Sequence, residues 1–307
     1  MPIEKLHIEQ FSHFELLAKQ VVEGFITGMH KSPFHGFSVE FAEHKLYNKG
    51  DSTRHIDWKL FARSEKLFLK RYEEETNLRC SIVIDNSSSM CYPKTKSNTS
   101  ITDLNKIGFA SYTAAALMYL LQKQSDAFGL TLFANDIEQR TPIKSTVAHQ
   151  KMLFDMLDVC MKTDSLNKTT NIAKSLHTIA ATQHKRSLVV IISDMLYDDN
   201  ELQNILNALQ HMRHQKHEIL LVHVLDQATE LRFEFDNVPH HFIDLETGIE
   251  VKCSPQEFKQ QYVQRMQAQM HTIKEKCLGY KVDYVAADNA QAFNEVLAAF
   301  LIRRQKQ

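Results

Sequence analysis

Apolar residues follow two different periods along the chain. Residues 9–29 repeat apolar side chains at three- and four-residue steps, which predicts one amphipathic helix. Residues 79–85 instead contain an unbroken, β-branched apolar run, which is typical of a strand buried on both faces of a sheet. Similar runs predict buried strands at 187–194 and 218–226. The central part of the chain therefore has the pattern of a sheet with both faces covered.

Strands and helices alternate through the rest of the chain. A turn at Asn135–Asp136 joins two strand-like stretches, 128–134 and 137–143, which predicts a hairpin and an antiparallel edge strand. A helix over 102–124 is expected to open at Ser100 and Asp103, which have the spacing of a capping box. The remaining predicted elements are helices at 147–160, 170–183, 199–213, 255–277 and 290–304, a strand at 281–287 and short β-like stretches within 231–252. Alternation of this kind predicts an α/β fold with a mostly parallel sheet that helices flank on both faces.

The N-terminal quarter has a separate pattern. Strand-like stretches at 37–41 and 67–72 lie on either side of the sequence GDSTRHIDW. In that sequence Arg54 and Asp57 are expected to pair and Trp58 to pack, which favours a structural role over a binding motif. We divide the chain into an N-terminal amphipathic helix, a small β segment carrying GDSTRHIDW and an α/β domain, at residues 1–30, 31–78 and 79–305.

Charge and apolar content exclude several classes of protein. Lysine and arginine number 36 against 37 acidic residues among 307, without the basic excess of a nucleic-acid-binding protein. The longest apolar stretches, 114–121 and 219–225, are shorter than the roughly 20 residues that cross a bilayer. The first residues lack the apolar core of a signal peptide. Five scattered cysteines fit reduced thiols. These features predict a cytoplasmic protein without membrane insertion.

The eight glycines form no nucleotide-binding loop. Neither GxGxxG nor GxxxxGK[ST] occurs, and these are the loops whose backbone binds nucleotide phosphates. The GxSxG motif of a serine hydrolase is absent as well. If ATP matters to this protein, we expect a different protein to hydrolyse it.

Two of the predicted buried strands end in an aspartate. In open α/β sheets, ligands bind beyond the carboxyl ends of the strands, at the point where the strand order reverses. The side chains expected to meet there all carry oxygen: Asp85, Ser87, Ser89, Thr169, Thr170 and Asp194. An all-oxygen site suits Mg²⁺ or Mn²⁺. The alternative interpretation of the serines is a polar turn after a strand.

The sequence Asp85-x-Ser87-x-Ser89, with Thr170 and Asp194 downstream, resembles the metal-ion-dependent adhesion site (MIDAS) of von Willebrand factor A domains. Further motifs resemble the DUF58 family: KSPFHGFSVEFAEHKLYNKGD (31–51), TRHIDW (53–58), LKRYEEE (69–75), Lys106 and FIDLETG (242–248). The resemblance extends over about residues 30–304. It implies a von Willebrand factor A-like domain over 79–305.

The resemblance also implies a role for each residue of the site. Ser87, Ser89 and Thr170 would offer hydroxyl oxygens directly to the metal. Asp85 and Asp194 would hold it mainly through bound waters and through hydrogen bonds to the serines. Neutral hydroxyl ligands leave much of the charge of the cation uncompensated, so an open position would attract an acidic side chain from a partner.

One departure from the family pattern concerns the threonine. Relatives place glycines just before the metal-binding threonine, whereas this chain has Lys168 and Thr169 there. Lys168 would repel a cation or pair with Asp85 or Asp194. Thr169 is a rival to Thr170 as the ligand.

Two functions follow as expectations. The first is a non-enzymatic, metal-dependent protein-interaction module. The resemblance implies an adaptor or chaperone-like partner of a MoxR-type AAA+ ATPase. The second is a metal-dependent hydrolase, similar to phosphatases that place a nucleophilic aspartate after a buried strand, with Asp85 as the nucleophile. Such phosphatases use DxD, whereas this chain has Asp85-Asn86-Ser87, so we rank the interaction module first.

Overall fold

The computed structural model describes the chain in two compact units. Described are residues 78–94, 96, 98, 104–163, 167–197, 201–289 and 293–304, and nearer the N-terminus 16, 19–23, 25, 44–46, 60–61, 63 and 67–70. One unit contains residues 1–26 and 78–307, and the other contains residues 27–77. The described residues of the predicted helix 9–29 are helical, and Val22 and Phe25 in it are buried.

The smaller unit contains one pair of described strands. Strand β1 (His44–Leu46) runs antiparallel to β2 (Phe68–Lys70), and β2 lies within the predicted strand 67–72. The predicted strand 37–41 and the sequence GDSTRHIDW lie outside the described residues.

The larger unit is built on a six-stranded sheet. Its strands are β3 (Arg79–Asp85), β4 (Ala127–Phe133), β5 (Ile137–Arg140), β6 (Leu188–Ser193), β7 (Glu218–Leu225) and β10 (Asp283–Asp288). Their order is β10-β7-β6-β3-β4-β5, and every neighbouring pair is parallel except β4 and β5. The predicted mostly parallel sheet with an antiparallel edge strand is confirmed.

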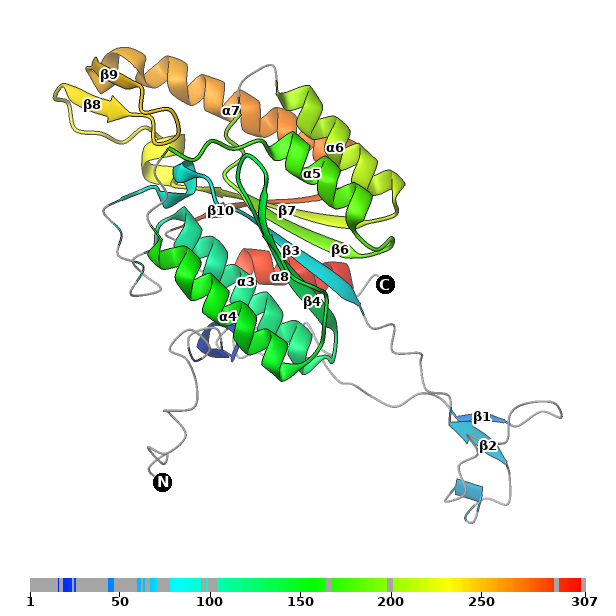
Figure 1. Cartoon of the computed structure of the whole chain (residues 1–307). Helices are drawn as coiled ribbons and strands as arrows, with labels where there is room; N and C mark the ends of the chain where they lie inside the picture. Colours follow the sequence, from blue (N-terminus) through cyan, green and yellow to red (C-terminus); the bar gives the residue numbers. More distant parts are fainter. Residues whose placement is uncertain are drawn as a thin grey trace, which may run out of the picture. The chain divides into compact units, whose positions relative to one another are not determined.

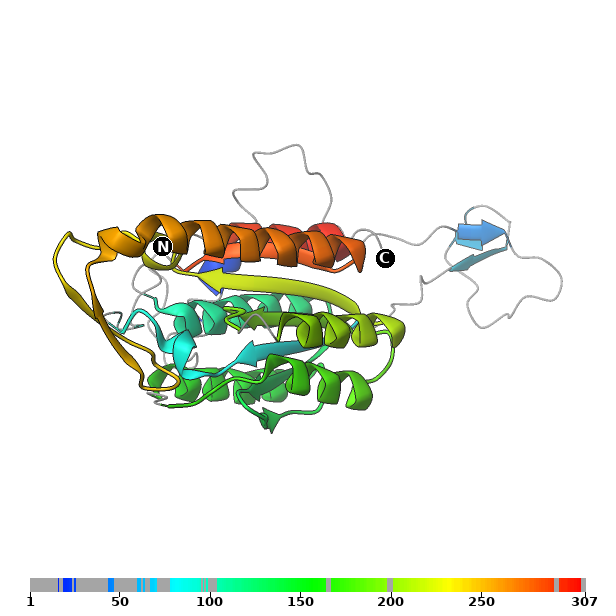
Figure 2. The same ribbon diagram turned by 90° about the horizontal axis from the view of Figure 1, so that it is seen from above.

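Helices cover both faces of this sheet (Figures 1 and 2). One face carries α5 (Ile172–Thr182), α6 (Leu202–His214) and α7 (Pro255–Gly279), and the other carries α3 (Lys106–Lys123), α4 (Val147–Lys162) and α8 (Asn294–Arg304). On the first face, side chains of the central strands pack with those of α5, α6 and α7, among them Val189, Leu176, Leu209 and Ile273. On the second, Phe109 of α3 stacks on Phe293 with ring centroids 4.9 Å apart. Because both faces are covered, every residue of β6 is buried, which explains the unbroken apolar run Leu188–Ile192.

The strand order reverses at β3. From β3 the chain passes to β4 on one side, and it later returns to β6 on the other side. The parallel register pairs Ile84 with Ile192, so Asp85 at the end of β3 lies beside Ser193 at the end of β6. The loops after these two strands therefore lead in opposite directions at the carboxyl end of the sheet, where the sequence predicts a binding site.

The start of α3 differs from the prediction. The helix begins at Lys106, and Asn105 is its N-cap, with a side chain that accepts a hydrogen bond from the Gly108 amide at 2.9 Å. The predicted start at 102, opened by Ser100 and Asp103, is wrong. Asn105 is one of the strongest N-cap residues, and its position places Lys106 in the first turn of the helix.

We expect Asn105→Ala to lower the free energy of unfolding by about 1 kcal/mol, because the amide of Gly108 would lose its capping partner. Urea denaturation followed by circular dichroism measures this. Gln124→Ala, at the other end of the same helix, is the control, because Gln124 caps α3 through its backbone amide and Ala keeps that amide. An equal loss in both variants would contradict the assignment of Asn105 as the N-cap.

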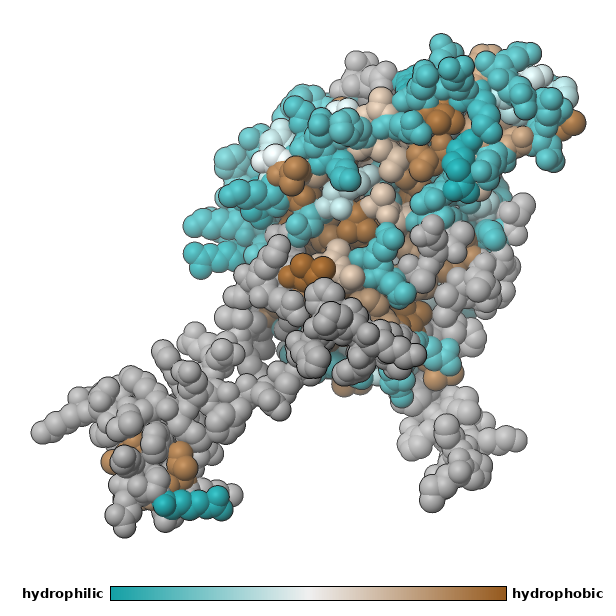
Figure 3. All heavy atoms as spheres, turned by 180° about the vertical axis from the view of Figure 1, so that it is seen from behind, coloured by the Kyte–Doolittle hydropathy of each residue, from teal (hydrophilic) through white to brown (hydrophobic). Residues whose placement is uncertain are grey.

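In the part of the chain that the structure describes, no helix is both long and apolar enough to cross a bilayer. The described surface in Figure 3 mixes hydrophilic side chains with apolar ones. All five cysteines are free thiols, and four of them are buried.

Candidate functional site

Asp85 closes β3 and begins a loop that is folded back on it. The Asp85 side chain is fully buried, and its Oδ1 accepts a hydrogen bond from the Ser87 amide at 3.0 Å. The chain then enters a short 3₁₀ helix, η3 (Ser88–Cys91). This turn brings the hydroxyl oxygens of Ser87 and Ser89 to 3.0 Å from one another. Two of the predicted hydroxyl ligands are therefore adjacent, next to the first carboxylate.

Two hydrogen bonds between Ser88 and Lys168 attach the threonine loop to this serine loop. The Ser88 amide donates to the Lys168 carbonyl at 3.0 Å, and the Lys168 amide donates to Ser88 Oγ at 2.8 Å. Thr170 then directs its hydroxyl toward Asp85, with 3.5 Å from Oγ1 to Oδ2. Thr169 is exposed. Of the two rival threonines, the structure brings Thr170 to the site.

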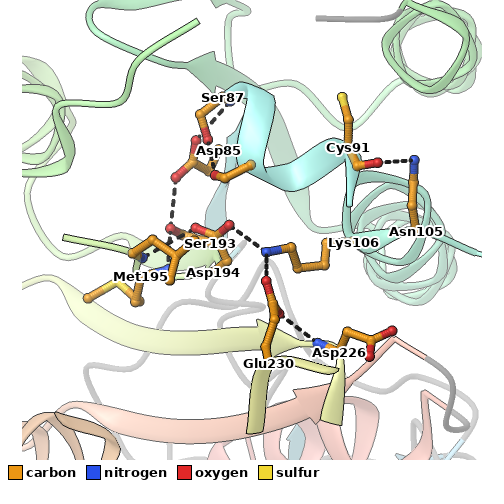
Figure 4. Close-up of polar contacts among 12 residues, drawn as sticks. Asp85, Ser87, Cys91, Asn105, Lys106, Ser193, Asp194, Met195, Asp226 and Glu230 are labelled. Carbon is orange, nitrogen blue, oxygen red and sulfur yellow. Dashed lines mark hydrogen bonds and ion pairs between the residues drawn. The ribbon is translucent and has the colours of Figure 1, made fainter. Parts of the chain in front are cut away.

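The end of β6 supplies the second aspartate. The Ser193 hydroxyl donates to Asp85 Oδ2 at 2.8 Å, so the ends of β3 and β6 are connected directly (Figure 4). Asp194 is fully buried and interacts with the Ser89 hydroxyl. All five predicted site residues therefore meet at one end of the sheet: Asp85, Ser87, Ser89, Thr170 and Asp194.

A buried lysine lies between Asp194 and a third carboxylate (Figure 4). Lys106 Nζ is 2.8 Å from Asp194 Oδ2 and 2.6 Å from Glu230 Oε1, and its side chain is fully buried. Burial alone would lower the pKa of Lys106, but Asp194 and Glu230 outweigh burial and raise it. Burial would likewise raise the pKa of Asp194, but the lysine outweighs burial and lowers it. Lys106 and Asp194 therefore form an ion pair inside the protein.

Lys168 does not lie where the sequence suggested. Its ammonium is 2.8 Å from Glu138 Oε1, at a partly exposed position, rather than on Asp85 or Asp194. Glu138 also accepts a hydrogen bond from the Asn86 side chain at 2.6 Å. The expected pairing of Lys168 with a site aspartate is wrong, because the loop backbone turns this side chain toward β5.

Glu246 brings a fourth carboxylate to the site. It lies between β8 (His240–Ile243) and β9 (Glu250–Cys253), and its Oε2 accepts a hydrogen bond from the Thr170 amide at 3.1 Å. The other oxygen, Oε1, is buried and has no hydrogen bond within the described residues, although the Ser89 hydroxyl is near enough to lower the pKa. Burial outweighs these contacts and raises the pKa of Glu246.

The site has the composition of a hard-cation site. Four carboxylates gather here, Asp85, Asp194, Glu230 and Glu246, and among the described residues the Lys106 ammonium pairs with Asp194 and Glu230. Burial, and then the neighbouring charge of Asp194, raise the pKa of Asp85 to about 7. Among the described residues, Asp85 is hydrogen-bonded by neutral groups of serine and threonine. A buried charge ordinarily requires a compensating charge or a metal ion, so the oxygen-rich side of this site fits Mg²⁺ or Mn²⁺.

Sequence reasoning missed the roles of two carboxylates. Glu246 lies within the motif FIDLETG, which by itself does not indicate that this side chain reaches the site. Glu230 lies in a helical turn, η4 (Gln227–Leu231), that begins two residues after β7 ends. The argument from strand ends, extended to this third strand, would have directed attention to it.

The comparisons with known proteins concern most of the chain. Residues 43–272 match the model of a family described as "Protein of unknown function DUF58". "Uncharacterized protein Mb1516" of Mycobacterium bovis and "Uncharacterized protein Rv1480" of Mycobacterium tuberculosis are each 25% identical to the chain over 212 residues. The matched region is 69% of this chain and 63% of each relative. The match thus covers less than two thirds of these relatives.

Two solved structures show a weaker likeness. One is the conserved hypothetical protein BatB from Bacteroides thetaiotaomicron, with 15% identity, a TM-score of 0.46, and coverage of 75% of this chain and 100% of that one. The other is the VWA domain of SpRpn10, with 12% identity, a TM-score of 0.38, and coverage of 72% of this chain and 94% of that one. Neither likeness informs the function of this chain.

Proposed function

Because the chain belongs to the DUF58 family, we propose that its von Willebrand factor A-like domain is a non-enzymatic protein-interaction module that binds its partner through a divalent cation. Ser87, Ser89 and Thr170 hold Mg²⁺ or Mn²⁺ by their hydroxyls. Asp85 and Asp194 support it through water and hydrogen bonds. A cation held in this way supplies positive charge that attracts an acidic side chain of the partner.

One observation carries the proposal. Asp85 is completely buried, and among the described residues it is hydrogen-bonded only by uncharged groups, while the Ser87 and Ser89 hydroxyls lie side by side next to it. A solvated turn after a strand would leave this carboxylate in water, at no electrostatic cost. Its burial beside clustered hydroxyls is instead what a cation site requires.

The geometry gives no support to the hydrolase alternative. A nucleophilic aspartate needs an oxygen that a substrate can reach. Both Asp85 oxygens accept hydrogen bonds inside the protein, Oδ1 from the Ser87 amide and Oδ2 from the Ser193 hydroxyl. A supporting carboxylate is the role that this environment suits.

We propose that the partner is a MoxR-type AAA+ ATPase and that the two proteins meet in the cytoplasm. The support is the family resemblance, together with a sequence that lacks GxxxxGK[ST] and so leaves nucleotide hydrolysis to another protein. Free, mostly buried thiols are consistent with a reducing compartment. In this function the chain works as an adaptor that brings client proteins to the ATPase.

The test is calorimetric titration of the purified protein with Mn²⁺ and with Mg²⁺. We expect Thr170→Val to weaken Mn²⁺ binding by about tenfold or more, because it removes one oxygen ligand and keeps the shape of the side chain. Thr169→Val is the matched control, because Thr169 is the exposed neighbour and we expect no change. Equal effects of the two substitutions would contradict the assignment of Thr170. Absence of binding by the parent protein, with and without added acetate as a stand-in for the acid of the partner, would contradict the proposed function.

A further inference from the structure

The turn between β8 and β9 has a defined conformation. The Glu246 amide donates to Asp244 Oδ1 at 2.9 Å, and the Gly248 amide donates to the Asp244 carbonyl at 2.9 Å. Gly248 adopts a φ of +72°, which a residue with a side chain rarely adopts. The Asn167 amide donates to the Leu245 carbonyl at 3.3 Å, which attaches the turn to the threonine loop. Glu246 is thus presented to the site by an ordered turn. Figure 2 shows this hairpin at the carboxyl end of β3.

The two oxygens of Glu246 differ in their surroundings. Oε2 is used by the amide of Thr170, the residue whose hydroxyl points to Asp85. Oε1 is buried and has no hydrogen bond within the described residues, although the Ser89 hydroxyl is near enough to the carboxyl group to lower its pKa. A carboxylate oxygen that is buried and left without a hydrogen bond costs free energy unless something positive contacts it. The Glu246 carboxylate is thus in contact with Ser89 and Thr170, two residues whose hydroxyls are proposed cation ligands.

We propose that Glu246 is an internal carboxylate ligand of the cation, presented by the β8–β9 turn and occupying the position that an acid of the partner takes on binding. The inference rests on the proposed function, because it requires that the site holds a cation. It adds that the free protein is self-ligated, so that a partner displaces the turn to gain access. Glu246 then contributes both to cation affinity and to the choice of partner.

The experiment measures Mn²⁺ binding in the full chain by two readouts. The first is affinity, with Glu246→Gln expected to weaken Mn²⁺ binding by about tenfold or more, because affinity of an oxygen site depends on ligand charge. Gln keeps an oxygen that can accept from the Thr170 amide, so this change removes the charge and the second oxygen of the carboxylate while the hydrogen bond to the threonine loop can remain. Glu250→Gln is the matched control, because Glu250 lies on the same hairpin, is exposed and bonds to His241 at 2.9 Å. We expect it to have no effect.

The second readout is the water-proton relaxation rate per bound Mn²⁺, which rises with the number of waters on the ion. We expect Glu246→Ala to raise this rate relative to the parent, because water enters the vacated position. Added acetate should lower the rate again in Glu246→Ala and leave the parent unchanged. A merely structural role of Glu246 would not produce this response to acetate.

The outcomes separate the two proposals. If the parent binds Mn²⁺ and Glu246→Gln binds it equally well, the inference is wrong and the proposed function stands. Tighter binding by Glu246→Gln also overturns the inference, because Glu246 would then obstruct the cation. If neither the parent nor any variant binds Mn²⁺, with or without acetate, the proposed function fails and the inference fails with it.

Discussion

Replacing Lys106 by methionine is expected to lower the free energy of unfolding by about 3–5 kcal/mol. Methionine has nearly the same length, so the packing volume is preserved and the ammonium is removed. Asp194, which is fully buried, and Glu230, whose side chain is 13% exposed, would then lose the cation that lies 2.8 Å and 2.6 Å from them. An uncompensated buried carboxylate costs several kcal/mol, whereas the net contribution of the intact ion pair is far smaller. Urea denaturation of the parent and of Lys106→Met, both in a chelating buffer, measures the difference in the free energy of unfolding.

The control for this prediction is a solvent-exposed lysine–aspartate ion pair of the same protein. Lys162 pairs with Asp158 one helical turn away on α4, where both side chains are exposed. Lys162→Met is expected to cost about 0.3–0.5 kcal/mol, the usual value for an exposed pair at this spacing. A loss below about 1 kcal/mol for Lys106→Met would show that water reaches Asp194 and Glu230, and it would contradict the buried ion pair.

The sheet could be predicted from the sequence because its central strands are buried on both faces. Such strands contain continuous apolar runs, Ile82–Ile84 in β3 and Leu188–Ile192 in β6, and a run of this kind stands out without any alignment. Asp85 and Asp194 follow these runs within two residues, which places both aspartates at the carboxyl end of a parallel sheet. That part of the site depends only on local sequence and on strand direction.

The remainder of the site depends on contacts that no local pattern encodes. Lys106 and Glu230 are 124 residues apart, and Thr170 and Glu246 are 76 residues apart. The start of α3 differs from the prediction because Asn105, like Ser100 and Asp103, is of a residue type that caps helices, and sequence spacing alone does not choose among them. The position of Lys168 in the sequence predicts that it lies near the aspartates, but the path of the loop directs its side chain to Glu138.

Asp85→Asn is expected to stabilise the metal-free protein and to abolish cation binding. Burial raises the pKa of Asp85 to about 7 from its ordinary value of 3.8, so the folded state keeps a proton that the unfolded state releases. Stability therefore falls as the pH rises from about 4 to about 7, and the full cost of the ionised carboxylate remains above that range. Asparagine cannot ionise. The gap between the variant and the parent should widen over this range by up to about 4 kcal/mol, at about 1.4 kcal/mol for each pH unit.

The measurement is urea denaturation in a chelating buffer between pH 4 and pH 8, with the same series repeated in saturating Mn²⁺. Manganese should stabilise the parent and not Asp85→Asn, because a ligand stabilises only a folded state that binds it. Asp126→Asn is the control: Asp126 is buried outside the site and accepts a hydrogen bond from the Leu78 amide at 3.0 Å, and its replacement should not increase stability. A gap that does not change with pH would mean that Asp85 carries no uncompensated charge. The observation on which the cation site depends would then be lost, and the hydroxyls of Ser87 and Ser89 would be those of an ordinary polar turn.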